Sequence, residues 1–178
     1  MEPKNFKVTP DIYASKGKRF ANLIIDYIIQ VLIGGLVGML IGLIINLTDN
    51  YELYEWFFVD EARWKDYLLG IIILLVYFII IESLTAHSIG KYITKTKIVM
   101  EDGSKPQISD IILRSLCRLI PFEQFSFLGD EARGWHDSMS NTYVVDEIKL
   151  KAKIERETGL ELIGKSLEEI DQIQKSTL

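Results

Sequence analysis

Four polar side chains recur at helical spacing within the first long apolar stretch of the sequence. They are Arg19, Asn22, Asp26 and Gln30, separated by three, four and four residues, so a helix places them on one face. A carboxylate in the middle of a membrane span costs about 2.5–3.5 kcal/mol on insertion scales. Asp26 must therefore face protein or water and needs a partner.

A second carboxylate, Glu82, lies near the end of the second apolar stretch, and we expect it at a depth comparable to that of Asp26. Two neighbouring carboxylates do not both ionise at low cost, so one should have a raised pKa unless a cation intervenes. The groups that could supply positive charge are Arg19, Arg114, Arg118, His87 and His136. Two interpretations stay open. Either the arginines neutralise the carboxylates and dock helices, or Asp26 and Glu82 bind a proton or small cation in transit.

The polar face of the first stretch continues as a row of glycines, Gly34, Gly38 and Gly42. Overlapping GxxxG motifs let another helix approach closely, because no Cβ separates the backbones. The partner helix could be the second span of the same chain or the first span of a neighbouring chain, and the sequence does not decide between them.

These residues must be positioned by two membrane spans. The apolar stretches run from Phe20 to Leu47 and from Tyr67 to Ala86, and about 20 residues suffice to cross a bilayer. The first is too long for a secretory signal peptide and lacks its small-residue cleavage site. We predict a single-domain, all-α membrane protein of 178 residues with spans at about 19–47 and 66–86.

The charges beside the spans predict their orientation. The loop from Thr48 to Asp66 carries six acidic and two basic residues, whereas basic residues precede the first span and follow the second. The acidic positions are Asp49, Glu52, Glu55, Asp60, Glu61 and Asp66, and the basic residues before the first span are Lys4, Lys7, Lys16, Lys18 and Arg19. We expect a multi-pass protein of the plasma membrane, the inner membrane of a bacterium. Both termini would be cytoplasmic, and the loop at about 48–65 external.

The rest of the chain is expected to cover the cytoplasmic side. Residues 88–95 are interpreted as a polar turn, and Thr96 to Met100 as a short strand that pairs with residues 141–145. An amphipathic helix at about 107–120 would lie in the interface, with Arg114 and Arg118 snorkelling toward anionic lipid phosphates. The tail, 146–178, is expected to be helical, packed on its own protein or bound to a partner. Its apolar stripe is Leu160, Ile163, Leu167, Ile170 and Ile173.

Several kinds of chemistry are set aside. Adjacent residues such as His136, Asp137 and Ser138 cannot supply catalytic-triad geometry, and we expect Asp137 to bridge to Arg114, Arg118 or Arg133 instead. Two distant histidines form no zinc signature, and the single cysteine excludes an internal disulfide. A net charge of −5 gives no indication of nucleic-acid binding. We therefore predict no catalytic residues, no metal and no cofactor.

The pattern resembles the RDD family of membrane proteins, named for one arginine and two aspartates. Arg19 and Asp26 match the arginine that opens the family's first span and the aspartate within it. Further matching positions are Glu82, Ser88, Gly90, Lys91, Asp102, Gly103, Arg114 and Arg118. The closing stretch ARGWHDSMSNTYVV matches the family's last motif and makes Asp137 the second aspartate. The resemblance runs from about Arg19 to Val145, within a membrane domain of residues 19–145 that follows an N-terminal segment, 1–18.

The resemblance implies a transport role, with cation–proton exchange suggested for some relatives. Many relatives carry a further apolar stretch before the His-Asp motif, but LIPFEQFSFLGDEA is too short to span. A path that needs a third helix would come from a homo-oligomer or a partner membrane protein. Two functions are expected, an oligomeric transporter of small cations or protons, or a non-transporting anchor or assembly factor that recruits a partner through its loop or tail. The candidate polar residues are Arg19, Asn22, Asp26, Gln30, Glu82, Arg114, Arg118, His136 and Asp137.

Overall fold

The computed structural model is mostly helical and carries one small sheet. It describes residues 6–59, 63–129 and 133–176, with side chains described up to residue 169. Lys4, Asp60 and Glu61, which contribute to the predicted orientation, lie outside the described residues, as do the side chains of Ile170 and Ile173. In chain order the elements are η1 (Pro10–Ile12), α1 (Lys16–Thr48), α2 (Tyr51–Tyr54), η2 (Glu55–Val59), α3 (Trp64–Thr85), α4 (Ile89–Thr94), β1 (Thr96–Val99), α5 (Ile108–Cys117), η3 (Glu123–Leu128), α6 (Trp135–Met139), β2 (Tyr143–Asp146) and α7 (Glu147–Ser176).

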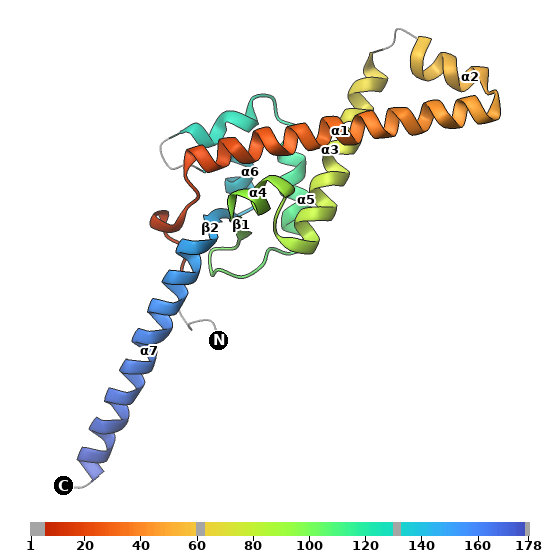
Figure 1. Ribbon diagram of the computed structural model, residues 1–178. Helices are drawn as coiled ribbons and strands as arrows, with labels where there is room; N and C mark the ends of the chain where they lie inside the picture. The colour runs from red at the N-terminus through yellow and green to blue at the C-terminus, as the bar shows by residue number, and fades with distance from the viewer. Residues whose placement is uncertain (1–5, 60–62, 130–132, 177–178) are drawn as a thin grey trace.

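Two helices, α1 and α3, are long and apolar enough to cross a bilayer. They have 33 and 22 residues, which correspond to about 50 Å and about 33 Å at 1.5 Å per residue. Ser15 caps α1 by accepting a hydrogen bond from the Lys18 backbone, and α3 ends where Ala86 turns left-handed with φ 59°. Figure 1 shows α3 crossing α1 at an angle, and apolar side chains on both helices are exposed. The predicted spans are confirmed as helices.

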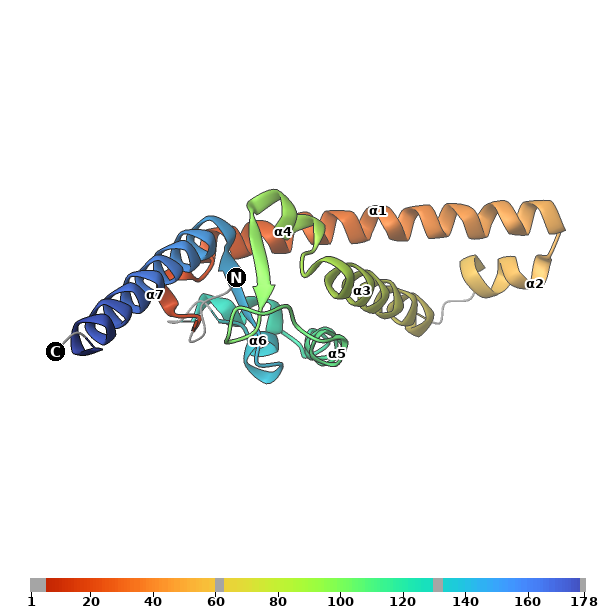
Figure 2. The same cartoon turned by 90° about the horizontal axis from the view of Figure 1, so that it is seen from below.

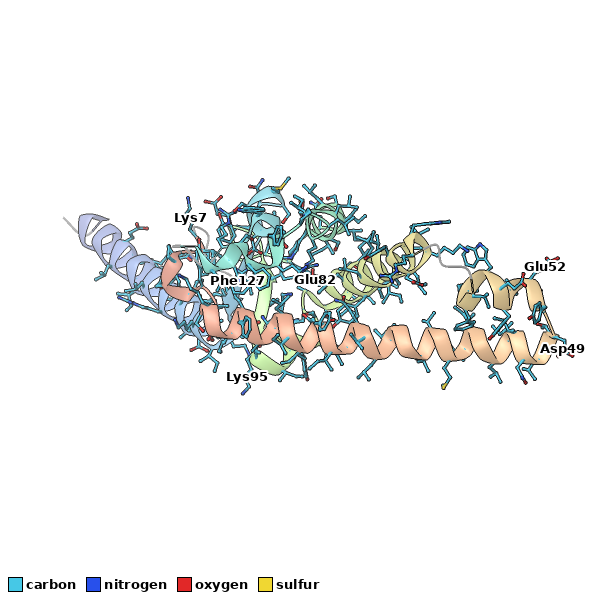
Figure 3. The ribbon with its side chains drawn as sticks, turned by 90° about the horizontal axis from the view of Figure 1, so that it is seen from above. Lys7, Asp49, Glu52, Glu82, Lys95 and Phe127 are labelled. Carbon is cyan, nitrogen blue, oxygen red and sulfur yellow. The ribbon has the colours of Figure 1, made fainter. Side chains whose placement is uncertain are left out.

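The predicted loop between the two long helices is itself helical over most of its described length. The Asn50 side chain starts α2 by accepting a hydrogen bond from the Leu53 N–H at 3.0 Å. The π-helix η2 then brings Trp56 and Phe57 into an edge-to-face contact with 4.5 Å between ring centroids. Figure 3 shows Asp49 at the far end of α1. This end of the long helices therefore carries only a short link, and the sheet lies at the other end.

The strands β1 and β2 form an antiparallel pair that begins with Thr96 opposite Asp146, which confirms the predicted pairing. The N-terminal segment extends this pairing, because the Ala14 N–H donates to the Val144 carbonyl at 2.9 Å. A buried apolar core lies beside the sheet and consists of Phe6, Val8, Ile12, Val99, Val145 and Leu150. The N-terminal segment and the first turns of α7 are thus built into one core with the strands.

A short helix, α4, stands where the sequence predicted a polar turn, so that prediction is wrong. Ser88 explains the helix, because its hydroxyl accepts a hydrogen bond from the Lys91 N–H at 3.3 Å and caps the first turn. Gly90 lets α4 lie directly against α1. A Cβ at this position would sit 2.7 Å from the backbone oxygen of Asn22, so only glycine fits without a shift.

The helix α5 occupies most of the predicted interfacial helix, but its charged face points inward. Arg114 and Ser115 are fully buried, whereas Ile108 is 63% and Leu116 is 46% exposed. The polar face packs against α3 and α6. The prediction that Arg114 and Arg118 snorkel outward to lipid phosphates is wrong, because both guanidinium groups pair with carboxylates inside the protein.

The last helix, α7, has 30 residues and projects away from the rest of the chain (Figures 1 and 2). Its beginning is anchored, because Leu150 is buried in the core and Ile154 packs against it. Further along, the apolar Leu160, Ile163 and Leu167 are exposed. The predicted helical tail is confirmed, and most of it lies beyond the core.

Candidate functional site

Polar side chains from several elements converge where α1 and α3 meet the folded end of the chain. Figure 3 shows Glu82 and Phe127 in this region, far from Asp49 at the other end of α1. We call the converging set the polar cluster. Its members are Arg19, Asn22, Asp26, Tyr77, Glu82, Ser88, Lys91, Arg114, Arg118, Glu123, His136 and Asp137.

Asp26 is 4% exposed and is held by neutral donors alone within the described part of the chain. One carboxylate oxygen accepts from the Tyr77 hydroxyl at 2.7 Å and from the Gly90 N–H at 2.8 Å. The other oxygen accepts from the Ser88 hydroxyl at 2.5 Å. The predicted need for a partner is therefore met by hydrogen bonds and not by a direct ion pair.

Glu82 is fully buried at the end of α3 and is surrounded by three cationic side chains. The Lys91 ammonium and the Arg118 guanidinium each lie 2.8 Å from its carboxylate, and Arg114 Nε lies 3.5 Å away. Burial lowers the pKa of Lys91 below its usual range, although the negative charge of Glu82 opposes this effect. The carboxylate thus fixes α3 to both α4 and α5.

Asp137, in α6, joins the other half of the cluster. Its carboxylate forms buried ion pairs with Arg19 and Arg114 and accepts from the Gly134 N–H at 2.8 Å. Burial alone would raise the pKa of Asp137, but the charges of Arg114 and Arg19 outweigh it and hold this pKa well below its usual range. Of the three predicted partners of Asp137, Arg114 forms an ion pair with it. A second ion pair is formed by Arg19, which was not predicted as its partner.

His136 and Glu123 form a pair beside Asp137. The His136 ring contacts Glu123 through Nδ1, and its Nε2 lies 3.3 Å from Asp137. Burial would raise the pKa of Glu123, but its hydrogen bond with His136 and the nearby histidine charge lower it overall. The ring therefore lies between two carboxylates whose pKa values are both depressed.

These contacts join into one continuous chain of polar groups. Asp26 and Glu82 are linked through Ser88, whose hydroxyl accepts a hydrogen bond from the Lys91 ammonium at 3.3 Å. In order of contact, the members are Asp26, Ser88, Lys91, Glu82, Arg114, Asp137 and Arg19. The cation between the two carboxylates is therefore Lys91, which was not among the groups predicted to supply the positive charge. Chains of titratable groups of this kind can relay protons or redistribute charge.

A cavity of about 230 Å³ opens beside the polar cluster. Its polar lining consists of Arg19, Asn22, Asp26, Gln30, Lys91, Arg114, Arg118, Glu123, Gln124 and His136. Its apolar lining consists of Leu23, Tyr27, Leu74, Phe78, Phe127 and Val144. Gln30 thus shares the space of Asp26, as expected for two residues on one helix face. Within residues 6–59, 63–129 and 133–176, no group of three or more His, Cys, Asp or Glu is placed to hold a metal ion.

The predicted polar residues converge, but four members of the cluster were not in the predicted set. These four are Tyr77, Ser88, Lys91 and Glu123. The spacing of Ser88 and Lys91 is a capping signal that indicates a helix start at this point. Asn22 differs from the charged members of the cluster in its contacts. Its side-chain amide is hydrogen-bonded with the hydroxyls of Thr94 and Thr96, at 2.5 and 3.0 Å.

The glycine row is largely open within this chain. A Cβ at Gly34 would meet only Ile73 of α3, at 3.8 Å. At Gly38 and Gly42 it would meet nothing within 4 Å among the described residues. The close helix packing expected at these glycines is therefore not made by the second span of the same chain.

Comparison with known proteins gives one match. A family model described as the RDD family matches residues 13–149. Searches of the curated proteins and of the solved structures gave no significant match. The matched range begins just before α1 and ends in the first turn of α7, so it contains every member of the polar cluster.

Proposed function

Because this chain belongs to the RDD family, we propose that it is an integral membrane protein that moves protons or small cations across the bilayer as a homo-oligomer. Asp26 is the titrating or cation-binding group in this proposal. The polar cluster around Glu82 and Asp137 holds the helices in place and sets the electric field at Asp26.

One observation carries the proposal, the difference between Asp26 and the other carboxylates of the polar cluster. Glu82 faces three cationic side chains, Asp137 faces two arginines, and Glu123 faces His136. Among the described residues, Asp26 is hydrogen-bonded to hydroxyl and amide donors without a direct ion pair, and it lines the cavity; Lys91 acts on it at longer range, through Ser88. A carboxylate without a direct ion pair in an apolar span is the group in the cluster best suited to take up a proton or a small cation.

In this proposal both termini lie in the cytoplasm, the polar cluster lies at the cytoplasmic end of the spans, and the link between α1 and α3 lies outside. The basic residues beside the spans support it. The location is a plasma membrane, the inner membrane if the protein is bacterial. The cavity would then face the cytoplasmic leaflet.

A homo-oligomer would supply the additional membrane helices that a transport path needs and that two spans do not provide. The apolar side chains of α1 and α3 are widely exposed, and Gly38 and Gly42 have open space before them. A neighbouring α1 can approach that face closely, because no Cβ separates the backbones. Residues 118–134, between the end of α5 and the start of α6, contain the short helix η3 and no third span among those described.

The decisive experiment is cation-driven proton movement in proteoliposomes, measured with sodium, lithium and potassium. We expect flux in the wild type and a loss to the level of protein-free liposomes in Asp26→Asn. Asp66→Asn, an exposed aspartate at the other end of α3, is the matched control and should retain flux. Both variants must first show wild-type insertion and oligomeric state. Full flux in a correctly assembled Asp26→Asn protein would contradict the assignment.

The exposed helix α7 favours a second candidate function, a non-transporting anchor that recruits a partner. Leu160, Ile163 and Leu167 are exposed on a helix that projects from the fold. This function predicts no flux in the wild type and a defect when residues 159–178 are deleted. The transporter predicts that the same deletion leaves flux intact, because the polar cluster lies elsewhere.

A further inference from the structure

We propose that His136 is a second proton-binding group of the cavity, and that a proton on its ring and a positive charge at Asp26 exclude one another. The inference rests on the proposed function, because it adds a titrating group to the proposed transport site. Three observations carry it, namely the position of the ring at the cavity, the acceptors that face both of its nitrogens and the charge balance of the polar cluster.

His136 lines the same cavity as Asp26. The residue is 8% exposed, so it is shielded from bulk solvent but borders the space in which a proton or cation would move. Histidine is the side chain whose charge ordinarily changes between pH 5 and 8. The arginines of the cluster stay charged throughout this range, and Lys91 is ion-paired with Glu82. His136 is therefore the basic member of the cluster best suited to exchange a proton with the cavity.

Both nitrogens of the His136 ring face a carboxylate. Nδ1 contacts Glu123, and Nε2 lies 3.3 Å from Asp137. The pKa values of both carboxyl groups are lowered, so both are ionised acceptors at neutral pH. A neutral imidazole carries one N–H and would turn a nitrogen lone pair toward one of them, whereas the charged ring presents an N–H on both sides. The contacts of the ring thus favour its protonated form.

The charge balance of the polar cluster favours the neutral ring instead. The cationic side chains Arg19, Lys91, Arg114 and Arg118 equal in number the carboxylates Asp26, Glu82, Glu123 and Asp137. The formal charges of the cluster therefore cancel only while His136 is neutral. A proton on the ring leaves one positive charge in excess, and a second one at Asp26 would repel it at short range in a buried site. Each positive charge therefore weakens the binding of the other.

The remaining charged or titratable groups near the ring do not offer a competing proton site. The arginines of α1 and α5 are paired with Asp137 or Glu82. Burial raises the pKa of Cys117, which keeps its thiol neutral. Arg133 is partly exposed, and its guanidinium lies 4.3 Å from the centre of the Tyr143 ring. The exchange of a proton near neutral pH is thus left to His136.

The test follows the protonation of the histidine rings by NMR in the full-length protein, with isotope-labelled histidine in detergent micelles. The chain has 2 histidines, and His87→Gln assigns their signals. At about pH 7, sodium, lithium or potassium replaces a bulky organic cation at equal ionic strength. We expect at least one of them to lower the ratio of protonated to neutral His136 by about tenfold, the size of a typical coupling between two sites. His87 pairs with Glu147 outside the polar cluster, so its ratio should not change.

Asp26→Asn provides a second arm that needs no added cation. The substitution removes a negative charge from the cavity, so the same ratio at His136 should again fall by about tenfold. Asp66→Asn, an exposed aspartate at the other end of α3, is the matched control and should leave both rings as in the wild type. A His136 ring that keeps one protonation state across the range in which histidine ordinarily titrates would overturn the inference. So would an equal ratio in the wild type and Asp26→Asn.

Flux in proteoliposomes separates this inference from the proposed function. Between about pH 8 and pH 6, wild-type flux should fall, and His136→Gln should reduce that fall by about tenfold, whereas His87→Gln should keep the wild-type profile. Loss of flux in Asp26→Asn beside an unchanged His136 ring would leave the transport assignment standing and refute the second proton site. A His136 ring that responds to Asp26→Asn in a protein without flux would do the reverse.

Discussion

At the scale of single residues, Arg114 holds the polar cluster together. Its guanidinium lies within ion-pair distance of both Glu82 and Asp137, so it joins α5 to α3 and to α6. A buried charge is tolerated only where partners replace its hydration, and removing one partner leaves the other uncompensated. The cluster is therefore sensitive to the loss of any single charge.

Acid should destabilise the protein through Asp137 and Glu123. Their ordinary pKa values are 3.8 and 4.5, and both are lowered in the folded state. The stabilisation from their pairing is therefore fully present above those ordinary values and is lost as the pH falls through the lower folded-state values. We expect a thermal unfolding midpoint that is level from pH 8 to about pH 5 and falls below about pH 4. Differential scanning fluorimetry across this range measures it.

Asp137→Asn is the companion variant. It leaves Arg19 and Arg114 without a carboxylate, so at neutral pH it should lower the free energy of unfolding by about 3–5 kcal/mol. It should also show a weaker fall in acid than the wild type does. Asp66→Asn, an exposed aspartate, should follow the wild-type curve. An Asp137→Asn protein as stable as the wild type at pH 7 would show that this ion pair is not structural.

The sequence predicted one half of the cluster better than the other. The sequence identified Arg19 and Asp26 for two reasons. A charged residue in a membrane span costs free energy and therefore needs a function or a partner. The spacing of the two residues also places them on one face of a helix. Lys91 was interpreted as one of the basic residues that follow the second span and set the orientation, since nothing in a linear sequence shows that α4 packs against α1 and brings Lys91 to Glu82. Glu123 follows a short irregular stretch and is placed by tertiary packing alone.

At the scale of elements, the short helix α4 positions Asp26. The Gly90 N–H and the Ser88 hydroxyl both donate to this carboxylate, so the start of α4 is fixed against α1. The close approach requires a residue without a Cβ at position 90. The polar-turn prediction failed because six residues are too few to show a helical apolar period, and the capping signal was not weighed.

Gly90→Ala should destabilise the protein and disturb Asp26. The new Cβ would meet backbone atoms of Asn22, which cannot move as a flexible side chain can. We expect a cost of about 1–3 kcal/mol, or a fall in the unfolding midpoint of roughly 2–12 °C. Gly35→Ala has open space and is the control, with an unchanged or raised midpoint expected from its helix propensity. Equal midpoints for the two variants would mean that α4 does not press on α1.

At the scale of the whole molecule, the two long helices are held differently at their two ends. The polar cluster and the sheet hold them at the folded end, whereas the far end of α1 lies beside the short helix α2 in Figure 1. The sequence predicted both spans and the strand pairing, because span length and β-prone segments are local signals. It could not predict that the N-terminal segment belongs to the sheet core, because Phe6 and Ile12 are scattered apolar residues in a short polar stretch.

The open glycine face leads to a prediction about assembly. Gly38→Leu should disrupt the proposed homo-oligomer, because the leucine side chain would hold a neighbouring α1 away. Leu36→Trp, on the opposite face of the same helix and 52% exposed, adds bulk away from the glycines and should leave the oligomeric state unchanged. Cross-linking in native membranes, followed by mass measurement in detergent, gives the readout. Identical oligomers for both variants would exclude the Gly34–Gly38–Gly42 face from the interface.

The polar cluster also imposes an order of events during synthesis. Asp26 and Glu82 reach the membrane on α1 and α3 before the ribosome has made α5 and α6. Lys91 follows Glu82 by nine residues, so this carboxylate has a countercharge almost at once. Arg19 must wait for Asp137, on an element more than a hundred residues later in the chain. The buried ion pair between α1 and α6 is therefore completed only after Asp137 has been synthesised.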